Sequence, residues 1–393
     1  MISNYINKLL NIEDVFINNI IYKDDSIEIF ISTKPKLHSC PSCGRQTKRV
    51  HDYRSQKIKD IPFHLKDCYL ILKKRRYHCS CGKHFFENYS FFSRYQHRTR
   101  RLTHSIAHEL RETVSIKYIS KKLNISSSTV TRILDTLSYE LPPLKKAIAI
   151  DEFKGNANTG KYQCILVDPI KCKVLDILPD RTQSHLTSYF RNIPKKERNQ
   201  VEFFVCDMWK QYIELGQIYF PNAKIIIDKY HFIRQITWAI DRIRKRLQQT
   251  MTPTLRKYYK RSKTLIHKRY DYDSLNQEEK EACDVMLLYN DDLRKSHYLK
   301  EWLYKICQEK KYSVQREQFW KWVADAETCG IKDFEDVAAT YRRFSKGILN
   351  AFKYGITNGP TEGFNNKIKV MKRTAYGINN FERFRTRILH CNN

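Results

Sequence analysis

Two aspartates each end a short apolar run, and their positions suggest metal-dependent chemistry. Asp151 ends the run in AIAIDEFKG, and Asp207 ends the run in FFVCDMWKQY. Side chains at the ends of neighbouring strands can project into one crevice, where two carboxylates repel each other unless cations lie between them. Mg²⁺, or Mn²⁺, suits such a site because it takes oxygen ligands and retains water and phosphate oxygens. Two such ions can assist an in-line displacement at phosphorus.

A third carboxylate is then expected from a helix beside the strands. Glu362, in TNGPTEGFNNKIKVMKR, fits this role, because we expect a helix to start near Pro360 or Thr361. On spacing alone the trio is a weak prediction, since the chain has 42 acidic residues and most strand-end aspartates cap turns. The same helix carries polar and basic residues at i+3, i+4 and i+7 spacing, which predicts a face for the DNA backbone: Asn365, Asn366, Lys369, Lys372 and Arg373.

Two cysteine pairs predict a small metal-stabilised domain. Cys40 and Cys43 lie in CPSCG, and Cys79 and Cys81 lie in KKRRYHCSCGKHF, with strand-like stretches between them. This layout is typical of a zinc ribbon, in which the metal replaces a core too small to form unaided. The second pair departs from the usual two-residue spacer, so nearby residues are alternative ligands: His78, His84 and Cys68. Free thiols in a small β domain are the other interpretation.

Helical periodicity follows from Arg101 to Leu137, in three segments. Asn124 lies between the second and third, where a helix-turn-helix needs a residue tolerant of positive φ. Ser126, Ser127 and Ser128 can cap the third helix. Short polar and basic side chains on that helix predict contacts with DNA: Ser127, Thr129, Thr131 and Arg132. An ordinary three-helix packing element is the alternative.

The charge balance favours a nucleic-acid partner. Lys and Arg number 72 against 42 Asp and Glu, a formal net charge of +30 that is spread along the chain. A distributed excess indicates a long DNA duplex laid across several domains. No run approaches about 18 apolar residues, and no secretory signal is apparent. We therefore expect a cytoplasmic, nucleoid-associated protein without a membrane segment, whose 12 cysteines are reduced or bind metal.

The strand and helix pattern predicts the remaining architecture. A short helix and a strand, Ser26 to Ser32, precede the first cysteines, and Leu141-Pro142-Pro143 marks a linker. Helical segments at 182–191 and 209–219 separate the later strands, and 232–351 is almost wholly helical. Three strands followed by alternating helix and strand is the order of a ribonuclease H-like fold. The five strands are expected at 147–150, 162–167, 173–178, 201–206 and 224–227.

These blocks resemble the ISL-three family of bacterial insertion-sequence transposases along nearly the whole chain. The resemblance covers the cysteine ribbon with RRYHC, the helix-turn-helix, AIDEFKG, VCDMWKQY, PNAKIIIDKYHFIRQ and TNGPTEGFNNKIKVMKRTAYGINNFERFRTRI. It implies a DDE transposase in which Asp151, Asp207 and Glu362 are the metal ligands. Asp228 and His231, in DKYHF, match a further signature that implies a supporting role, and a purely structural role for His231 is the alternative.

The expected protein is therefore multidomain α+β. A zinc ribbon at 1–92 and a helix-turn-helix at 93–143 precede a ribonuclease H-like α/β domain at 144–393, with a helical insertion at about 238–350. The resemblance implies binding to terminal inverted repeats, hydrolysis at the element end and attack of the freed 3′-hydroxyl on target DNA. Joining two ends predicts a homodimer or larger assembly. The alternatives are a DNA-binding regulator without enzymatic activity and a metal-dependent nuclease that does not join.

Overall fold

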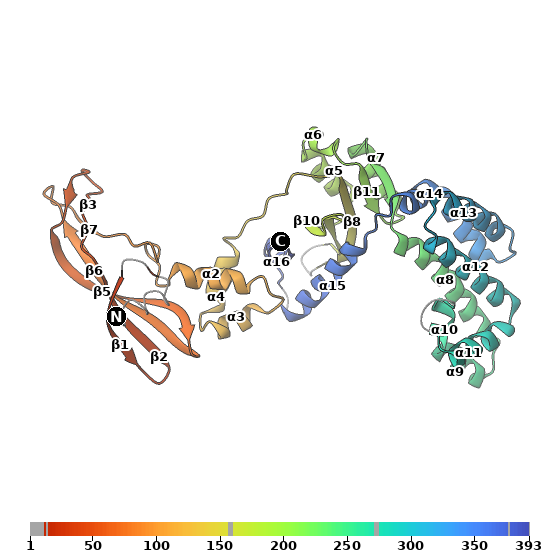
Figure 1. Cartoon of the computed structure of the whole chain (residues 1–393), viewed down its shortest axis with the longest axis horizontal. Coiled ribbons are helices and arrows are strands. Elements are labelled where there is room, and N and C mark those ends of the chain that lie inside the picture. Colours follow the sequence, from red (N-terminus) through yellow and green to blue (C-terminus); the bar gives the residue numbers. More distant parts are fainter. Residues whose placement is uncertain (1–11, 13–14, 156–159, 271–274, 376–377, 393) are drawn as a thin grey trace. The chain divides into compact units, whose positions relative to one another are not determined.

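The computed structural model of the chain describes residues 12, 15–155, 160–270, 275–375 and 378–392. They belong to two compact units: the chain before Glu140 together with Lys367–Asn392, and Glu140–Asn366 (Figure 1). Each unit has hydrophobic core clusters of its own. Among the described helices, none combines the length and apolarity that crossing a membrane requires.

The first unit begins with an N-terminal sheet in the order β1-β2-β6-β5, with β7 paired to β6. On β2, Ile27, Ile29 and Ile31 alternate with more exposed residues and are buried, as expected of a half-buried strand. The predicted strand at 26–32 is therefore confirmed. β1 occupies part of the stretch where a helix was expected, and the rest of that stretch lies mostly outside the described residues. The strands are β1 (Val15–Tyr22), β2 (Ser26–Thr33), β3 (His38–Ser39), β4 (Gln46–Thr47), β5 (Val50–Phe63), β6 (Lys66–His78) and β7 (His84–Phe86).

Three short helices follow: α2 (Arg100–Glu109), α3 (Ile116–Lys122) and α4 (Ser127–Leu134). The turn before α4 forms as predicted, because Asn124 adopts a φ of 47° and Ser126 caps α4 by accepting the backbone N–H of Thr129. The buried carboxylate of Asp60 on β5 accepts hydrogen bonds from the Thr99 hydroxyl and from Arg101 Nε, at 2.6 and 2.7 Å. These bonds attach the start of α2 to the sheet.

The last helix, α16 (Phe381–Asn392), belongs to this first unit although 144–393 was expected to form one catalytic domain. The physical reason is a set of hydrogen bonds to the helix-turn-helix. Arg387, 2% exposed, donates from Nη2 to the carbonyls of Glu112 and Val114 at 2.7 and 2.9 Å. His390 Nε2 donates to the carbonyl of Ala107 at 2.6 Å. α16 is therefore attached to the helix-turn-helix by these hydrogen bonds.

The second unit contains the predicted five-stranded sheet, in the order β10-β9-β8-β11-β12. β8 is antiparallel to β9 and parallel to β11, and β11 is parallel to β12. This is the ribonuclease H-like arrangement that the sequence indicated. The strands are β8 (Ala147–Lys154), β9 (Tyr162–Asp168), β10 (Lys173–Leu178), β11 (Phe203–Cys206) and β12 (Lys224–Ile227).

Helices accompany the sheet and form the predicted insertion between β12 and α15 (Gly359–Thr374). Within the insertion, buried Trp322 donates to the carbonyl of Leu299 at 2.7 Å. Gly347 lies against β12, where a Cβ would come within 2.6 Å of Ile227 Cγ1, so a larger side chain would separate α14 from the sheet. The helices are α5 (Gln183–Asn192), α6 (Lys195–Arg198), α7 (Lys210–Tyr219), α8 (Lys229–Leu247), α9 (Pro253–Arg261), α10 (Lys263–His267), α11 (Gln277–Leu288), α12 (Asp291–Gln308), α13 (Tyr312–Glu327) and α14 (Lys332–Tyr354).

Candidate functional site

The two predicted aspartates lie on adjacent parallel strands. Asp151 is inside β8 rather than at its end, because the strand continues to Lys154. Asp207 directly follows β11. Val205 of β11 pairs with Ala149 of β8, and continuing this register by two residues brings Asp207 beside Asp151 on the same face of the pleat.

Asp228 extends this row to a third strand. Cys206 pairs with Ile227 of β12, so the next residue on each strand, Asp207 and Asp228, also lie side by side. The backbone N–H of Asp228 donates to the carbonyl of Cys206 at 2.9 Å, which continues the parallel ladder. Asp151, Asp207 and Asp228 therefore form one row across β8, β11 and β12, which we call the aspartate row.

Burial and mutual repulsion disfavour the ionised form of the carboxyl groups in the aspartate row. Burial, together with the charges of Asp207, Glu152 and Asp228, raises the pKa of Asp151 to about 7. Burial and the charge of Glu152 raise the pKa of Asp207 to about 6. Burial and the charge of Glu362 raise the pKa of Asp228. Such shifts arise where carboxylates share a site without a cation between them.

The N-terminal part of α15 is attached to the aspartate row at two points. Asp228 Oδ1 accepts the backbone N–H of Asn358 at 2.9 Å, just before the helix. One turn into α15, Asn365 Nδ2 donates to Asp151 Oδ2 at 3.0 Å. Glu362 lies between these points, is exposed, and acts electrostatically on Asp228. α15 thus brings Glu362 close enough for its charge to act on Asp228.

The donor set fits divalent cations. Oxygen ligands dominate, and the buried Asn365 Oδ1 has no hydrogen-bond partner among the described residues although its Nδ2 is bound to Asp151. A buried acceptor without a donor is costly, and a cation-bound water would supply one. The carboxylates remain more widely spaced than the four thiols described below, the only described group whose ligand atoms all lie within 4.8 Å.

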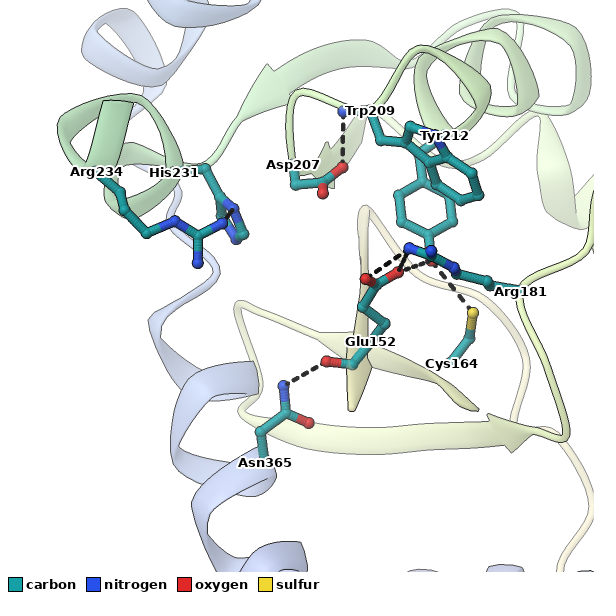
Figure 2. Close-up of polar contacts among 9 residues, drawn as sticks. All are labelled: Glu152, Cys164, Arg181, Asp207, Trp209, Tyr212, His231, Arg234 and Asn365. Carbon is teal, nitrogen blue, oxygen red and sulfur yellow. Dashed lines mark hydrogen bonds and ion pairs between the residues drawn. The ribbon is translucent and has the colours of Figure 1, made fainter. Parts of the chain in front are cut away.

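Sequence reasoning missed a second network, which involves Glu152 and Arg181 (Figure 2). Arg181 Nη1 donates to both carboxylate oxygens of Glu152 at 2.7 Å. Its guanidinium carbon lies 4.5 Å from the Tyr162 ring centroid and 4.8 Å from that of Trp209. Trp209 in turn donates its backbone N–H to Asp207 Oδ1 at 2.8 Å. The only sequence signal was that Glu152 directly follows Asp151.

His231 lies on α8 beside the aspartate row. Its Nε2 is 4.0 Å from Asp228 Oδ2, and its Nδ1 is 3.2 Å from Arg234 Nη2. Burial and the charge of Arg234 lower the pKa of His231 to about 4, so the ring is neutral at physiological pH. The structure therefore connects this histidine to both an aspartate of the row and an arginine that sequence reasoning did not select.

The four predicted cysteines lie together in the first unit. Cys40 Sγ is 3.6 Å from Cys81 Sγ, and Cys43 Sγ is 3.6 Å from Cys79 Sγ. A tetrahedral zinc with Zn–S bonds of about 2.3 Å separates its sulfurs by about 3.8 Å, so the set fits zinc. A glycine at positive φ follows each pair, Gly44 at 74° and Gly82 at 85°.

The alternative zinc ligands lie elsewhere. Cys68 is 2% exposed and belongs to the core of the N-terminal sheet. The rings of His78 and His84 contact each other with their centroids 4.8 Å apart, outside the group of four thiols. The one-residue spacer of the second pair is therefore compatible with a four-cysteine cluster.

The side chains expected to contact DNA are largely accessible. On α4, Ser127 and Arg132 are exposed, and Thr129 and Thr131 are half-buried. The residues on α15 are exposed except for half-buried Lys372: Asn366, Lys369, Lys372 and Arg373. Asn365 differs from this set, because it is buried and bound to Asp151. The DNA contacts themselves stay a prediction.

A zinc ribbon, a helix-turn-helix and a ribonuclease H-like domain with a row of aspartates, in this order, define a multidomain protein that acts on DNA. Family models match all three parts: zinc-finger of transposase IS204/IS1001/IS1096/IS1165 over residues 36–82, helix-turn-helix domain of transposase family ISL3 over 87–138, and transposase over 148–388. The last match spans more than half of the chain. The chain therefore belongs to the ISL3 family of insertion-sequence transposases and is a DNA-modifying enzyme with DNA-binding domains.

Individual relatives agree with this assignment. The chain is 26% identical over 372 residues to a transposase for insertion sequence element IS1001 from Bordetella parapertussis, covering 91% of this chain and 90% of the relative. It is 21% identical over 258 residues to a transposase for insertion sequence element IS1557 from Mycobacterium tuberculosis, covering 59% and 57% of the two chains. A stretch of 56 residues is 41% identical to an ATP-dependent protease of Lactococcus lactis subsp. lactis, but covers only 18% of that protein.

Proposed function

We propose that the chain is a DDE transposase that cleaves the ends of its element and joins them to target DNA. Asp151, Asp207 and Glu362 are the proposed ligands of two divalent ions, Mg²⁺ or Mn²⁺. When bound, such ions activate the attacking oxygen and stabilise the leaving oxygen at phosphorus. The observation that carries this proposal is the aspartate row, in which strand register aligns Asp151, Asp207 and Asp228. Burial raises the pKa values of Asp151 and Asp207, as expected of carboxylates that share a site without a cation.

The surrounding residues of the chain hold this site in shape. Asn365 fixes one oxygen of Asp151, and the Trp209 N–H fixes one oxygen of Asp207. Asp228 anchors the segment that leads into Glu362. Since phosphoryl transfer with metal ions needs no protein nucleophile, positioning and electrostatics are the main contributions of the protein.

We also propose that Cys40, Cys43, Cys79 and Cys81 bind one zinc ion, which stabilises the ribbon. The ribbon and α4 then bind the terminal inverted repeats, and two ends meet in a homodimer or larger assembly on double-stranded DNA. A non-enzymatic regulator would have no use for the aspartate row and its attachment to α15. A nuclease that does not join remains the second candidate, distinguished by its products.

Labelled DNA that carries the element end, incubated with purified protein and Mg²⁺ or Mn²⁺, tests the proposal. We expect cleavage at the end and a joined product with target DNA. Asp207→Ala is expected to abolish both while end binding is retained. Asp325→Ala, which replaces an exposed aspartate of α13, is the matched control and should remain active. Binding without cleavage by the wild type would refute the enzymatic assignment, and cleavage without joining would favour a nuclease.

A further inference from the structure

One arginine beside the aspartate row is held in place without being neutralised. Arg234 lies on α8, one turn after His231, so both side chains share a face of the helix. Its Nη2 is 3.2 Å from His231 Nδ1. Figure 2 shows His231 and Arg234 on one side of Asp207, with Arg181 on the other.

The hydrogen bond between Arg234 and His231 can have only one direction. A guanidinium can only donate, so His231 Nδ1 accepts. The proton of the neutral ring is then on Nε2, which faces Asp228 Oδ2 at 4.0 Å. The ring thus orients the guanidinium, while Asp228, fixed by the backbone N–H of Asn358, lies beside the ring beyond hydrogen-bond distance.

Aromatic side chains flank the guanidinium. Its central carbon lies 4.6 Å from the Trp238 ring centroid and 5.3 Å from the Tyr230 ring centroid. These contacts restrict the side chain further, since a guanidinium is attracted to the face of an aromatic ring.

Arg234 is nevertheless only half-buried, so part of its side chain can be reached from solvent. Its Nε is buried and has no hydrogen-bond partner among the described residues. Arg181, the other guanidinium at this site, donates to both oxygens of Glu152, whereas within the described part of the chain no carboxylate forms an ion pair with Arg234. An oriented guanidinium with free donors matches the paired oxygens of a phosphate.

We propose, on the basis of the proposed function, that Arg234 binds a non-bridging oxygen of the DNA phosphate that reacts, with His231 as its positioning residue. Arg234 would be a catalytic residue because it touches the reacting group. Its charge would offset the negative charge on the non-bridging phosphoryl oxygens as the attacking oxygen approaches phosphorus.

Substitution at Arg234 separates this role from general DNA binding. Arg234→Gln and Arg234→Lys are expected to slow end cleavage by about 10²–10³-fold, with affinity for end DNA in Ca²⁺ nearly unchanged. Arg242→Gln is the matched control, because Arg242 is on the same helix but pairs with Asp333 in the insertion at 2.6 Å. It removes the same charge and should cleave at nearly the wild-type rate.

A sulfur substitution at the cleaved phosphate tests direct contact. With Mn²⁺, which accepts sulfur better than Mg²⁺ does, replacing the oxygen that Arg234 binds should slow the wild type. The same DNA should slow Arg234→Lys no further. His231→Asn, whose amide oxygen can replace Nδ1 as the acceptor, should retain more activity than His231→Ala. An equal sulfur effect in wild type and Arg234→Lys would overturn the proposal.

The result also distinguishes this inference from the proposed function. If Arg234→Gln cleaves as fast as Arg242→Gln while Asp207→Ala is inactive, Arg234 has no catalytic role and the DDE assignment stands. If Asp207→Ala itself cleaves normally, the proposed function fails and this inference with it. Arg234→Lys keeps the charge and most of the stem, so it provides the answer if Arg234→Gln does not fold.

Discussion

Arg181 Nη1 lies 2.7 Å from both carboxylate oxygens of Glu152, and the same guanidinium contacts the ring of Trp209. Glu152 follows Asp151 on β8, and Trp209 fixes Asp207 after β11. One ion pair thus connects the two strands that carry the first two proposed metal ligands. Removing it should disturb their spacing without touching either ligand.

We therefore expect Arg181→Met to reduce end cleavage by about 10–100-fold, the usual effect of losing a residue that orients metal ligands. Glu152→Gln should lose less, because its amide oxygen still accepts from Arg181. The control is Lys210→Met, which removes an exposed pair with Glu214 on α7. Equal cleavage rates for Arg181→Met and Lys210→Met would show that the ion pair has no positioning role.

The raised pKa of Asp151 predicts how stability depends on pH in the absence of divalent metal. The pKa is about 7 in the folded chain against an ordinary value of 3.8. Between these values the folded state binds more protons than the unfolded state, so stability falls as pH rises through this window. Asp207, with a pKa of about 6, acts in the same direction.

Asp151→Asn should therefore unfold at a higher temperature than the wild type at pH 8 and at nearly the same temperature at pH 4. A gain of about 2–4 °C is expected for each 1 kcal/mol recovered. Mg²⁺ should raise the midpoint of the wild type at pH 8 and have little effect on Asp151→Asn. Asp325→Asn serves as control, and a difference between wild type and Asp151→Asn that does not change with pH would contradict the prediction.

The four-cysteine cluster predicts a zinc-dependent N-terminal unit. Purified wild type should contain about one zinc ion per chain, and Cys43→Ser should lose most of it. Loss of metal should lower the unfolding temperature, because structural zinc contributes directly to folding. Cys172→Ser replaces an exposed cysteine outside the cluster and should keep both zinc and stability. Metal analysis and thermal unfolding of the three proteins decide the matter.

The hydrogen bonds between α16 and the helix-turn-helix predict that replacing the buried Arg387 lowers stability more than replacing an exposed arginine does. Arg387→Met leaves two carbonyls, those of Glu112 and Val114, without their donor, and should destabilise the first unit by about 2–4 kcal/mol. Arg383 is on the same helix as Arg387, and Arg383→Met removes its exposed ion pair with Asp135. This substitution should lower the free energy of unfolding by only about 0–1 kcal/mol. Urea unfolding of both variants measures the difference, and equal costs would argue against the packing role of Arg387.

The exposed guanidinium of Arg132 on α4 predicts a sequence-specific contribution to DNA binding. Arg132→Ala should weaken binding to the element end by about 1–3 kcal/mol more than binding to random DNA, if the side chain reaches base edges. Lys117→Ala removes an exposed charge from α3 and should affect both DNAs alike. A competition assay at fixed salt compares them, and an equal loss on both DNAs with Arg132→Ala would assign this residue to the phosphate backbone.

The fold followed from periodic patterns wherever local sequence determines structure. Apolar runs gave the five strands of the catalytic sheet, and Asn124 and Ser126 gave the turn into α4. The unit in which α16 packs could not be predicted from the sequence. Its packing depends on hydrogen bonds from Arg387 to carbonyls that lie far away in the sequence. Domain boundaries drawn along the chain cannot describe such packing.

The acidic residues of the candidate site could be predicted from the sequence, but the residues that surround them could not. Asp151 lies within a recognisable strand and Asp207 directly follows another, and a parallel register aligns them. Arg181 and Arg234 carry no such signal, since each is one of many basic residues in a chain with 72 Lys and Arg. Their importance comes from their partners: Glu152 on β8 for Arg181, and His231 on the same face of α8 for Arg234.

The position of the helical insertion has a consequence for the order in which the protein becomes active. Asp151 and Asp207 emerge early during synthesis, but Glu362 follows only after α8 to α14. The proposed site therefore forms through contacts between distant parts of the sequence, which are made late in folding. A nascent chain that stops within the insertion would already have its ribbon and all five strands of its catalytic sheet, yet would lack the third proposed acid. On the proposed assignment, the order of the elements along the chain delays DNA cleavage until nearly the whole chain has been made.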